Sequence, residues 1–239
     1  MPDVVVIIPA RLASERLPRK MLLAETGKPL VQHTVERAMA ADVGPVVVAA
    51  DHQEIADALA PFGTEVVLTD PNHPSGTDRI AEVAADRGEP FVINVQGDEP
   101  EIDPKIIRDL SFRLDDSGAV MATVSVPYIG DVSDPNRVKV VTGTDDRALY
   151  FSRSPIPFSR GEPVEPRLHV GIYAYTRDFL LRYPTLEPTP LERAEKLEQL
   201  RVLEHGFRID VLAADGHAAG IDTAEQYADF VQRFTSTKP

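Results

Sequence analysis

The chain has 239 residues, with 25 Lys and Arg against 38 Asp and Glu, which gives a formal net charge of -13 at pH 7. This acidity argues against nucleic acid and anionic membranes as partners, because both would repel the chain. The sequence has no cysteine, which excludes disulfides, thiolate zinc sites and cysteine nucleophiles. The length suits one large domain, or one domain with two lobes.

The apolar run at residues 4–8 is far shorter than the roughly 18 residues that a membrane-spanning helix needs. The residues before it, Met1-Pro2-Asp3, lack the basic region of a secretory signal. We therefore expect a soluble, cytoplasmic protein.

The first half of the chain alternates apolar runs with amphipathic patterns. Residues 4–9 are rich in β-branched side chains without polar alternation, which is typical of a strand buried on both faces. Pro29 suits the first position of a helix, and Asp51 with Glu54 matches a capping box. We predict strands at 4–9, 46–50, 66–69 and 91–96, and helices at 29–40, from Asp51, at 77–86 and from Asp103-Pro104.

The second half is richer in strands. Thr189 and Glu192 form a capping box, and Gly206 suits the end of the helix that this box begins. Pro and charged residues over 155–166 indicate a loop or arm. We predict strands at 120–126, 138–141, 149–152, 169–175 and 208–212, a long helix at 190–205 and a closing helix at 223–234.

Strands that alternate with helices over short links indicate a parallel sheet covered on both faces. We predict an α/β fold with a doubly wound, mostly parallel but mixed sheet. In such sheets, ligands bind beyond the carboxyl ends of the strands, so the loops at those ends are the candidate site.

The loop after the first strand carries four cations within ten residues: Arg11, Arg16, Arg19 and Lys20. Two arginines can grip phosphate oxygens in bidentate fashion, and a lysine adds a point charge. The loop lacks the glycines of a Walker or dinucleotide motif. It is either a polyphosphate clamp or an ordinary charged surface loop.

Two aspartates follow predicted elements where a metal would be useful. Asp98 lies at the end of the fourth strand, where a carboxylate could hold a divalent ion, or where Gly97 and Asp98 could simply form a turn. Asp222 is a second such residue, but with Glu225 it also matches a helix capping box, and either Asp222 or Thr223 could be the cap. Together with the basic loop they suggest magnesium-assisted chemistry at a phosphate.

Ser75 and Gly76 lead into a predicted helix. Free N–H groups and a hydroxyl at this position could read the polar edge of a ligand, or Ser75 could be a helix cap only.

Eight segments occur in an order that resembles one enzyme family, the 3-deoxy-manno-octulosonate (Kdo) cytidylyltransferases, over residues 4–234. The segments are RLASERLPRK, SGTDRIAEV, NVQGDEP, NRVKVV, ALYFSRSPIP, HVGIYAY, LERAEKLEQLRVLEHG and GIDT.

The resemblance implies a Rossmann-like nucleotidyltransferase fold with a smaller lobe for dimerisation and sugar binding. It also implies a single cytidylyltransferase domain over 1–239, with a nucleotide-binding half at about 1–118 and a sugar-acid and dimerisation half at about 119–239. The reaction implied is CTP plus Kdo giving CMP-Kdo and pyrophosphate, a step toward lipopolysaccharide. A homodimer is implied because ALYFSRSPIP resembles the family's dimer contact.

The resemblance also assigns roles. Lys20, Arg11, Arg16 and Asp98 would be catalytic, with the cations neutralising charge on the phosphates. Asp98 and Asp222 would hold Mg²⁺. The nucleotide would contact Ala10, Arg11, Ser75, Gly76 and Arg79. The sugar acid would contact Gln96, His169, Tyr173, Glu198 and Gln199, with Arg153 facing its carboxylate.

Three of these residues also have a purely structural interpretation. Glu198 would otherwise be one more charge on a solvated helix, and His169 and Tyr173 would be packing residues. They are four residues apart on a predicted strand, so they share one face, which makes a joint role plausible.

Other functions remain to be weighed. 8-Amino-Kdo or sialic acid could replace Kdo, although SGTDR and RLPRK favour the Kdo branch. A nucleotide-binding regulator without activity is disfavoured because Lys20, Asp98 and Asp222 are all present. The chain departs from the family in a shorter stretch between Phe158 and His169, in Phe158 where Trp is usual, and in Arg19 where Gly is usual.

Overall fold

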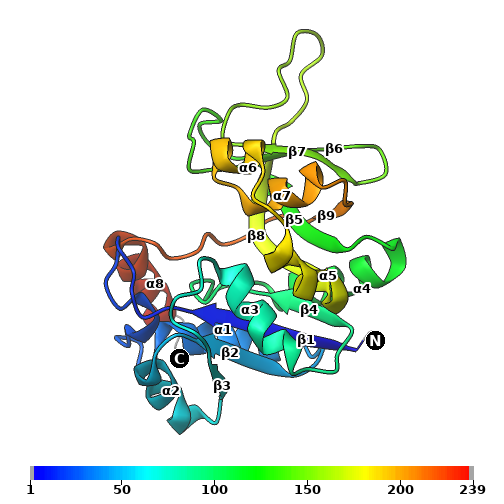
Figure 1. Cartoon of the computed structure of the whole chain (residues 1–239). Helices are drawn as coiled ribbons and strands as arrows, with labels where there is room; N and C mark the ends of the chain where they lie inside the picture. Colours follow the sequence, from blue (N-terminus) through cyan, green and yellow to red (C-terminus); the bar gives the residue numbers. More distant parts are fainter. Residues whose placement is uncertain (1–2, 237–239) are drawn as a thin grey trace.

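The structure is a computed structural model that describes residues 3–236. One nine-stranded sheet runs through the molecule in the order β3-β2-β1-β4-β8-β5-β9, and the β6–β7 hairpin attaches to β8 (Figure 1). The strands are β1 (Val4–Ala10), β2 (Val46–Ala50), β3 (Glu65–Leu68), β4 (Phe91–Asn94), β5 (Met121–Pro127), β6 (Lys139–Thr142), β7 (Ala148–Ser152), β8 (Arg167–Thr176) and β9 (Ile209–Ala213).

The sheet is mixed but mostly parallel, as predicted. Strands β1 to β4 are mutually parallel, and β5 is parallel to β9. Strand β8 is antiparallel to both β4 and β5 and so joins the two parallel parts of the sheet. All predicted strands are present, with ends that differ by a few residues at most.

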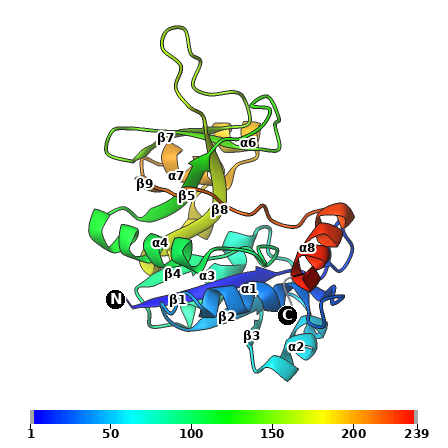
Figure 2. The same cartoon turned by 180° about the vertical axis from the view of Figure 1, so that it is seen from behind.

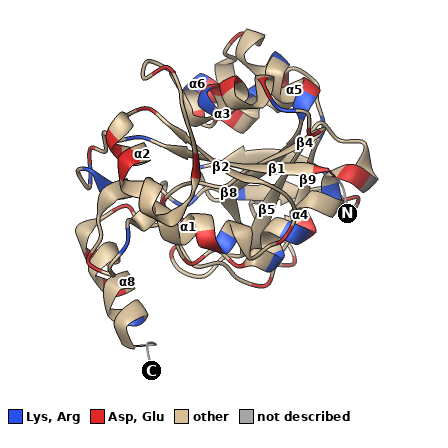
Figure 3. Ribbon diagram, turned by 90° about the horizontal axis from the view of Figure 1, so that it is seen from below, with Lys and Arg blue, Asp and Glu red and all other residues tan. Residues whose placement is uncertain are grey.

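Helices cover both faces of the sheet (Figure 3). They are α1 (Leu30–Met39), α2 (Gln53–Leu59), α3 (Gly76–Ala85), α4 (Pro104–Ser117), α5 (Arg177–Arg182), α6 (Pro190–Glu195), α7 (Glu198–Glu204) and α8 (Ala224–Ser236), with short 3-10 turns η1 (Lys20–Leu22), η2 (Ala60–Phe62) and η3 (Tyr183–Thr185). The sequence interpretation missed α5.

Alternation along the strands creates two cores. On β1, Val4, Val6 and Ile8 pack with α1 and α4, whereas Val5 and Ile7 pack with α3 and α5 on the other face. Period-two alternation sends successive side chains to opposite faces, so a strand covered on both sides reads as an unbroken apolar run.

The predicted single helix over 190–205 is wrong. It is broken into α6 and α7 at Lys196, whose backbone is left-handed with φ 55°. The Arg153 guanidinium donates to the carbonyl oxygens of Glu195 (2.6 Å) and Lys196 (3.4 Å), so these oxygens are engaged outside the helix. The break places Glu198 and Gln199 at the first turn of α7.

Two predicted helix starts also differ. Pro29 is the N-cap of α1 rather than its first residue. Asp51 does not cap α2, because its carboxylate accepts a hydrogen bond from Leu12 N (2.8 Å) in the loop after β1. The cap is His52, whose ring accepts from Glu54 N.

Strand β8 contains a bulge that matters for the site. Thr123 of β5 pairs with Tyr173, but the next residue, Val124, pairs with Val170. Gly171 and Ile172 are therefore extra residues on β8, and they bend the strand.

The last segment returns to the first half of the sheet. After β9 the chain crosses back as an extended stretch, and α8 packs beside α1 (Figure 2). Tyr227 and Phe230 of α8 join a small core with Leu17, Leu30 and Ile221. Within residues 3–236, every helix is too short or too polar to span a membrane.

Candidate active site

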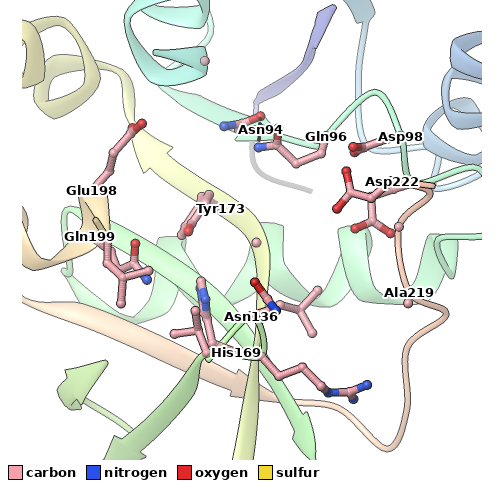
Figure 4. A pocket seen from close by; sticks show the side chains of 18 of the residues that line it. Asn94, Gln96, Asp98, Asn136, His169, Tyr173, Glu198, Gln199, Ala219 and Asp222 are labelled. Carbon is pink, nitrogen blue, oxygen red and sulfur yellow. Dashed lines mark hydrogen bonds between the residues drawn. The ribbon is translucent and has the colours of Figure 1, made fainter. Parts of the chain in front are cut away.

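A cavity of about 710 Å³ opens between the ends of β4 and β8, helix α7 and the stretch before α8. Figure 4 shows Glu198 and Gln199 on one side of Tyr173, and Asp98 and Asp222 on the other. Nine residues predicted from the sequence line it: Arg16, Gly76, Gln96, Asp98, His169, Tyr173, Glu198, Gln199 and Asp222.

One end of the cavity holds a charged cluster. The Lys20 Nζ atom lies 2.5 Å from Asp98 Oδ2 and 3.0 Å from Asp222 Oδ1, and Arg16 Nη2 lies 2.9 Å from Asp222 Oδ2. Burial alone would lower the pKa of Lys20, but the two carboxylates outweigh it and the pKa is raised. Lys20 is therefore a fixed cation that holds the two carboxylates together.

The same two carboxylates fit a divalent metal. They converge on one point, now marked by Lys20 Nζ, and carboxylate oxygens suit hard cations. Among residues 3–236, no group of three or more His, Cys, Asp or Glu side chains is arranged to bind a metal. Two protein ligands suit Mg²⁺, which usually completes its octahedron with water and substrate phosphates.

The turn that carries Asp98 is tightly built. A Cβ on Gly97 would lie 3.0 Å from both Pro9 O and Met21 Sδ, so the close approach to β1 favours glycine. Thr34 Oγ1 donates to Gly97 O (3.0 Å) from α1. The turn interpretation of Gly97-Asp98 is thus correct, and the same turn aims Asp98 into the cavity.

The segment that carries Asp222 is attached to this turn. Ile221 N donates to Asp98 O at 2.9 Å. The buried His217 Nε2 lies 3.0 Å from Glu99 Oε2. Two contacts therefore fix the approach of two aspartates that are more than 120 residues apart in sequence.

Thr223, not Asp222, is the residue whose side chain caps α8. Thr223 Oγ1 accepts from Gln226 N at 3.3 Å, while the Asp222 carboxylate faces Arg16 and Lys20. The capping interpretation of Asp222 is wrong, and its side chain is available to a ligand.

The residues predicted to contact the nucleotide lie at the ends of β1 and β3. Ser75 is the N-cap of α3, with Oγ accepting from Asp78 N (3.1 Å). Arg11 Nη2 donates to His73 O (3.3 Å) in the same loop. Ala10 is the buried last residue of β1.

Arg79 is fully buried beneath this loop. Its Nη1 donates to Thr69 Oγ1 (2.5 Å) and Asp70 O (3.2 Å), and burial lowers its pKa. Its Nε and Nη2 atoms have no hydrogen-bond partner among the described residues. Arg79 therefore supports the loop from below and does not line the cavity.

The other end of the cavity carries the predicted sugar-acid residues. Thr77 Oγ1 donates to the Glu198 carboxylate at 2.7 Å, and burial of that carboxylate raises its pKa despite this hydrogen bond. Gln199 is buried beside it. Burial lowers the pKa of His169 to about 3 and raises that of Tyr173. These groups offer hydrogen-bond donors and acceptors of several kinds, as polyhydroxylated ligands require.

The structure places Arg153 outside the cavity lining. Its guanidinium donates to the backbone oxygens of Pro135 (2.8 Å), Glu195 and Lys196 and so connects the loop before β6 to the break between α6 and α7. Arg137 does line the cavity, with its guanidinium carbon 5.2 Å from the Tyr128 ring centre.

Other lining residues were missed from the sequence. Thr77 lies inside the SGTDR segment, and Asn136 and Arg137 lie inside NRVKVV. These motifs indicated that the segments belong to the site, but they did not indicate which of their residues line the cavity. Asn94, which accepts from Gln96 Nε2 (3.4 Å), looked like the end of an apolar strand. His217 also lines the cavity, and Thr123 is buried behind the lining against His169; neither carried a local signal, because their contacts are long-range.

Comparison with known proteins gives a consistent result. The family model for cytidylyltransferases matches residues 5–209. A relative from Geobacter metallireducens, named 3-deoxy-manno-octulosonate cytidylyltransferase, is 45% identical over 96% of each chain.

Solved structures agree. A CMP:2-keto-3-deoxy-manno-octonic acid synthetase complexed with CTP is 40% identical, covers 98% of this chain and 99% of its own, and superposes with a TM-score of 0.94. A cytidylyltransferase from Leptospira borgpetersenii, 16% identical over 100% of this chain and 89% of its own, shares the fold with a TM-score of 0.66.

Proposed function

The chain belongs to the family of 3-deoxy-manno-octulosonate cytidylyltransferases, and from this premise we propose that it joins CTP to Kdo and releases pyrophosphate. The observation that carries the proposal is one cavity with a cation and carboxylate cluster at one end and a set of polar hydrogen-bonding side chains at the other. The two ends match a triphosphate and a polyhydroxylated acid.

In this reaction the anomeric hydroxyl oxygen of the sugar acid bonds to the α-phosphorus of CTP. The bond from that phosphorus to the bridging oxygen breaks, and the hydroxyl proton is lost to solvent. Charge grows on the phosphate oxygens and on the leaving pyrophosphate. Lys20 and Arg16 at the cavity and Arg11 in the same loop place fixed positive charge there before the reaction begins.

Enzymes of this family generally use a divalent metal, and we assign Mg²⁺ to Asp98 and Asp222. When bound, the ion would neutralise phosphate charge and orient both substrates. Lys20 would then exchange one or both carboxylates for a phosphate oxygen.

The cytidine is assigned to the ends of β1 and β3, around Ala10, Arg11, Ser75 and Gly76, with Arg79 supporting the loop. The sugar acid is assigned to Gln96, His169, Tyr173, Glu198 and Gln199. Arg137 takes the place of Arg153 as the arginine assigned to the sugar acid, because of these two only Arg137 lines the cavity. Apart from Gln96, this division follows the proposed nucleotide half at 1–118 and sugar-acid half at 119–239. A cytoplasmic location is part of the same proposal.

A homodimer is also part of the proposal. Strand β7 pairs only with β6, which leaves an edge of the sheet open among the described strands. Leu149 on β7 is 54% exposed and Phe158 on the following arm is 88% exposed. Exposed apolar side chains next to an open strand edge are typical of an interface.

The test is a pyrophosphate-release assay with CTP, Mg²⁺ and each candidate acid. We expect turnover with Kdo, and CMP-Kdo as the product by mass spectrometry. Higher kcat/KM with 8-amino-Kdo or sialic acid would reassign the substrate. Absence of pyrophosphate release with all three acids would overturn the enzymatic proposal. Light scattering on the wild type and on Leu149→Glu tests the dimer, which the charge should dissociate.

A further inference from the structure

The bulge in β8 brings together two rings that a regular strand would separate. Residues four apart on a straight strand have Cα atoms about 13 Å apart. Here the ring centres of His169 and Tyr173 are 5.5 Å apart. The extra residues Gly171 and Ile172, without partners in the register of β4 or β5, account for the compression.

One hydroxyl on the neighbouring strand ties this bulge to the histidine. Thr123 is fully buried on β5, and its Oγ1 lies 2.8 Å from Ile172 O, 3.2 Å from Val170 O and 3.0 Å from His169 Nε2. Two of these three partners are carbonyl oxygens, which only accept.

The Thr123 hydroxyl has one proton to donate. If the hydroxyl donated this proton to His169, the carbonyl oxygens of Val170 and Ile172, which are buried beside Thr123, would receive no hydrogen bond from it. If it donates to the bulge carbonyl at 2.8 Å, its oxygen is free to accept from His169 Nε2–H. The second arrangement satisfies more buried polar groups, which is the rule in protein interiors.

We propose that Thr123 is a positioning residue that fixes His169 in the tautomer with the proton on Nε2, so that Nδ1 presents a lone pair to a hydroxyl of the sugar acid. The recognition step rests on the proposed function. His169 lines the cavity, and within residues 3–236 no hydrogen bond to its Nδ1 is found.

The side chains around His169 keep its imidazole ring neutral. Phe151 packs edge-on against the His169 ring, with ring centres 4.9 Å apart. The Tyr173 ring is tilted against the same ring, with ring centres 5.5 Å apart. This half-buried imidazole packs among aromatic rings that lower its pKa and keep it neutral, and a neutral ring has one donor and one acceptor nitrogen. With Nε2 committed to Thr123, the acceptor faces the ligand.

The tautomer is read directly by NMR. In long-range ¹H–¹⁵N correlation spectra of the ¹⁵N-labelled enzyme, the chain's six histidines give separate patterns, and His169→Gln assigns the one in question. We expect the Nε2–H pattern for His169 in the wild type and in Thr123→Ser, which keeps the hydroxyl. Thr123→Val should change it toward Nδ1–H. An Nδ1–H pattern in the wild type, or no change in Thr123→Val, would overturn the proposal.

Kinetics tests the recognition step. Thr123→Val should raise the KM for Kdo about ten-fold, the worth of one hydrogen bond, and leave the KM for CTP unchanged. Thr123→Ser should restore the wild-type value, which a role in packing alone would not predict, because Ser lacks the methyl group. Equal changes in the KM for Kdo in Thr123→Val and Thr123→Ser, or an equal rise in the KM for CTP, would contradict the positioning role of Thr123.

The two proposals fail differently. If the wild type made no CMP-Kdo, the proposed function would fail while the NMR pattern still decided the role of Thr123. If turnover were normal and the tautomer were Nδ1–H, only the positioning role would be lost. Unchanged circular dichroism and melting temperature in Thr123→Ser show that any effect of Val arises from the hydroxyl.

Discussion

At the scale of single residues, the site depends on opposite charges held close together. Asp98 and Asp222 would repel each other without a cation between them, and Lys20 supplies that cation. The pKa of Lys20 is raised by these carboxylates, so the ammonium stays charged through the physiological range. In the proposed reaction, Lys20 would transfer its hydrogen bonds to a phosphate.

Replacing that cation is expected to slow chemistry. Lys20→Met keeps the aliphatic stem and removes the charge. We expect kcat to fall about 10²–10³-fold, because a fixed charge at a developing anion is worth that much. The KM for Kdo should change little. Lys28→Met, at a lysine that pairs with Glu36 away from the cavity, is the matched control and should leave kcat unchanged. A fall in stability with normal kcat would assign Lys20 to structure alone.

The metal assignment has its own test. Asp222→Asn preserves α8, because Thr223 caps it, but replaces one carboxylate by a weaker ligand. We expect turnover to need at least ten-fold more Mg²⁺, and the rise in melting temperature caused by Mg²⁺ with CTP to shrink. Glu225→Gln, an exposed neighbour at the start of α8, serves as control. A magnesium dependence like that of the wild type would exclude Asp222 as a ligand.

At the scale of elements, the left-handed residue between α6 and α7 decides where Glu198 and Gln199 point. Lys196 holds φ 55°, a conformation that costs most residues about 1 kcal/mol relative to glycine. Arg153 holds the break open by binding the carbonyls on both sides of it. The local strain is thus balanced by contacts from Arg153, the residue that follows β7.

A pair of variants tests this break. Lys196→Gly and Lys196→Ala both remove the side chain, but only glycine tolerates positive φ freely. We expect the free energy of unfolding of the Ala variant to lie about 1 kcal/mol below that of the Gly variant, by urea denaturation. Equal stability of the two variants would mean that the break carries no strain.

The break between α6 and α7 and the bulge in β8 show what the sequence could and could not predict. Buried strands and the Thr189 and Glu192 cap were readable, since they depend on residues close together in the chain. The break in 190–205 depends on Arg153, more than 40 residues away, and the bulge depends on Thr123 across the sheet. Local patterns carry no information on such contacts. Motif order located the cavity residues, but it placed Arg153 in the pocket, where the structure has Arg137.

At the scale of the whole molecule, the cavity exists because distant segments meet on one sheet. Strand β8 joins the parallel strands of the first half to β5 and β9, and the chain then returns so that Asp222 reaches Asp98. The net charge of -13 would repel a triphosphate and a sugar acid, so the local cations of the loop after β1 must overcome it. Weak binding at high salt is the expected consequence.

Folding stability should carry a signature of the buried histidine. The pKa of His169 is lowered to about 3 by burial, against 6.5 for an ordinary histidine. Between these values the unfolded chain binds more protons than the folded one, so this contribution is fully present above pH 6.5 and is lost as pH falls. At pH 5 the loss from this group is at most about 2 kcal/mol.

The measurement is the free energy of unfolding of the wild type and of His169→Gln at pH 7.5 and pH 5, by urea denaturation. Glu198 titrates in the opposite sense, because its raised pKa means that the folded state holds more protons near pH 5. Only the difference between the two proteins therefore isolates His169. We expect the wild type to lose more stability than His169→Gln on acidification, by up to about 2 kcal/mol. Equal losses of unfolding free energy in the two proteins would show that the His169 ring takes up a proton as readily in the folded protein as in the unfolded chain. Water would then reach this ring more freely than its packing against Phe151 implies.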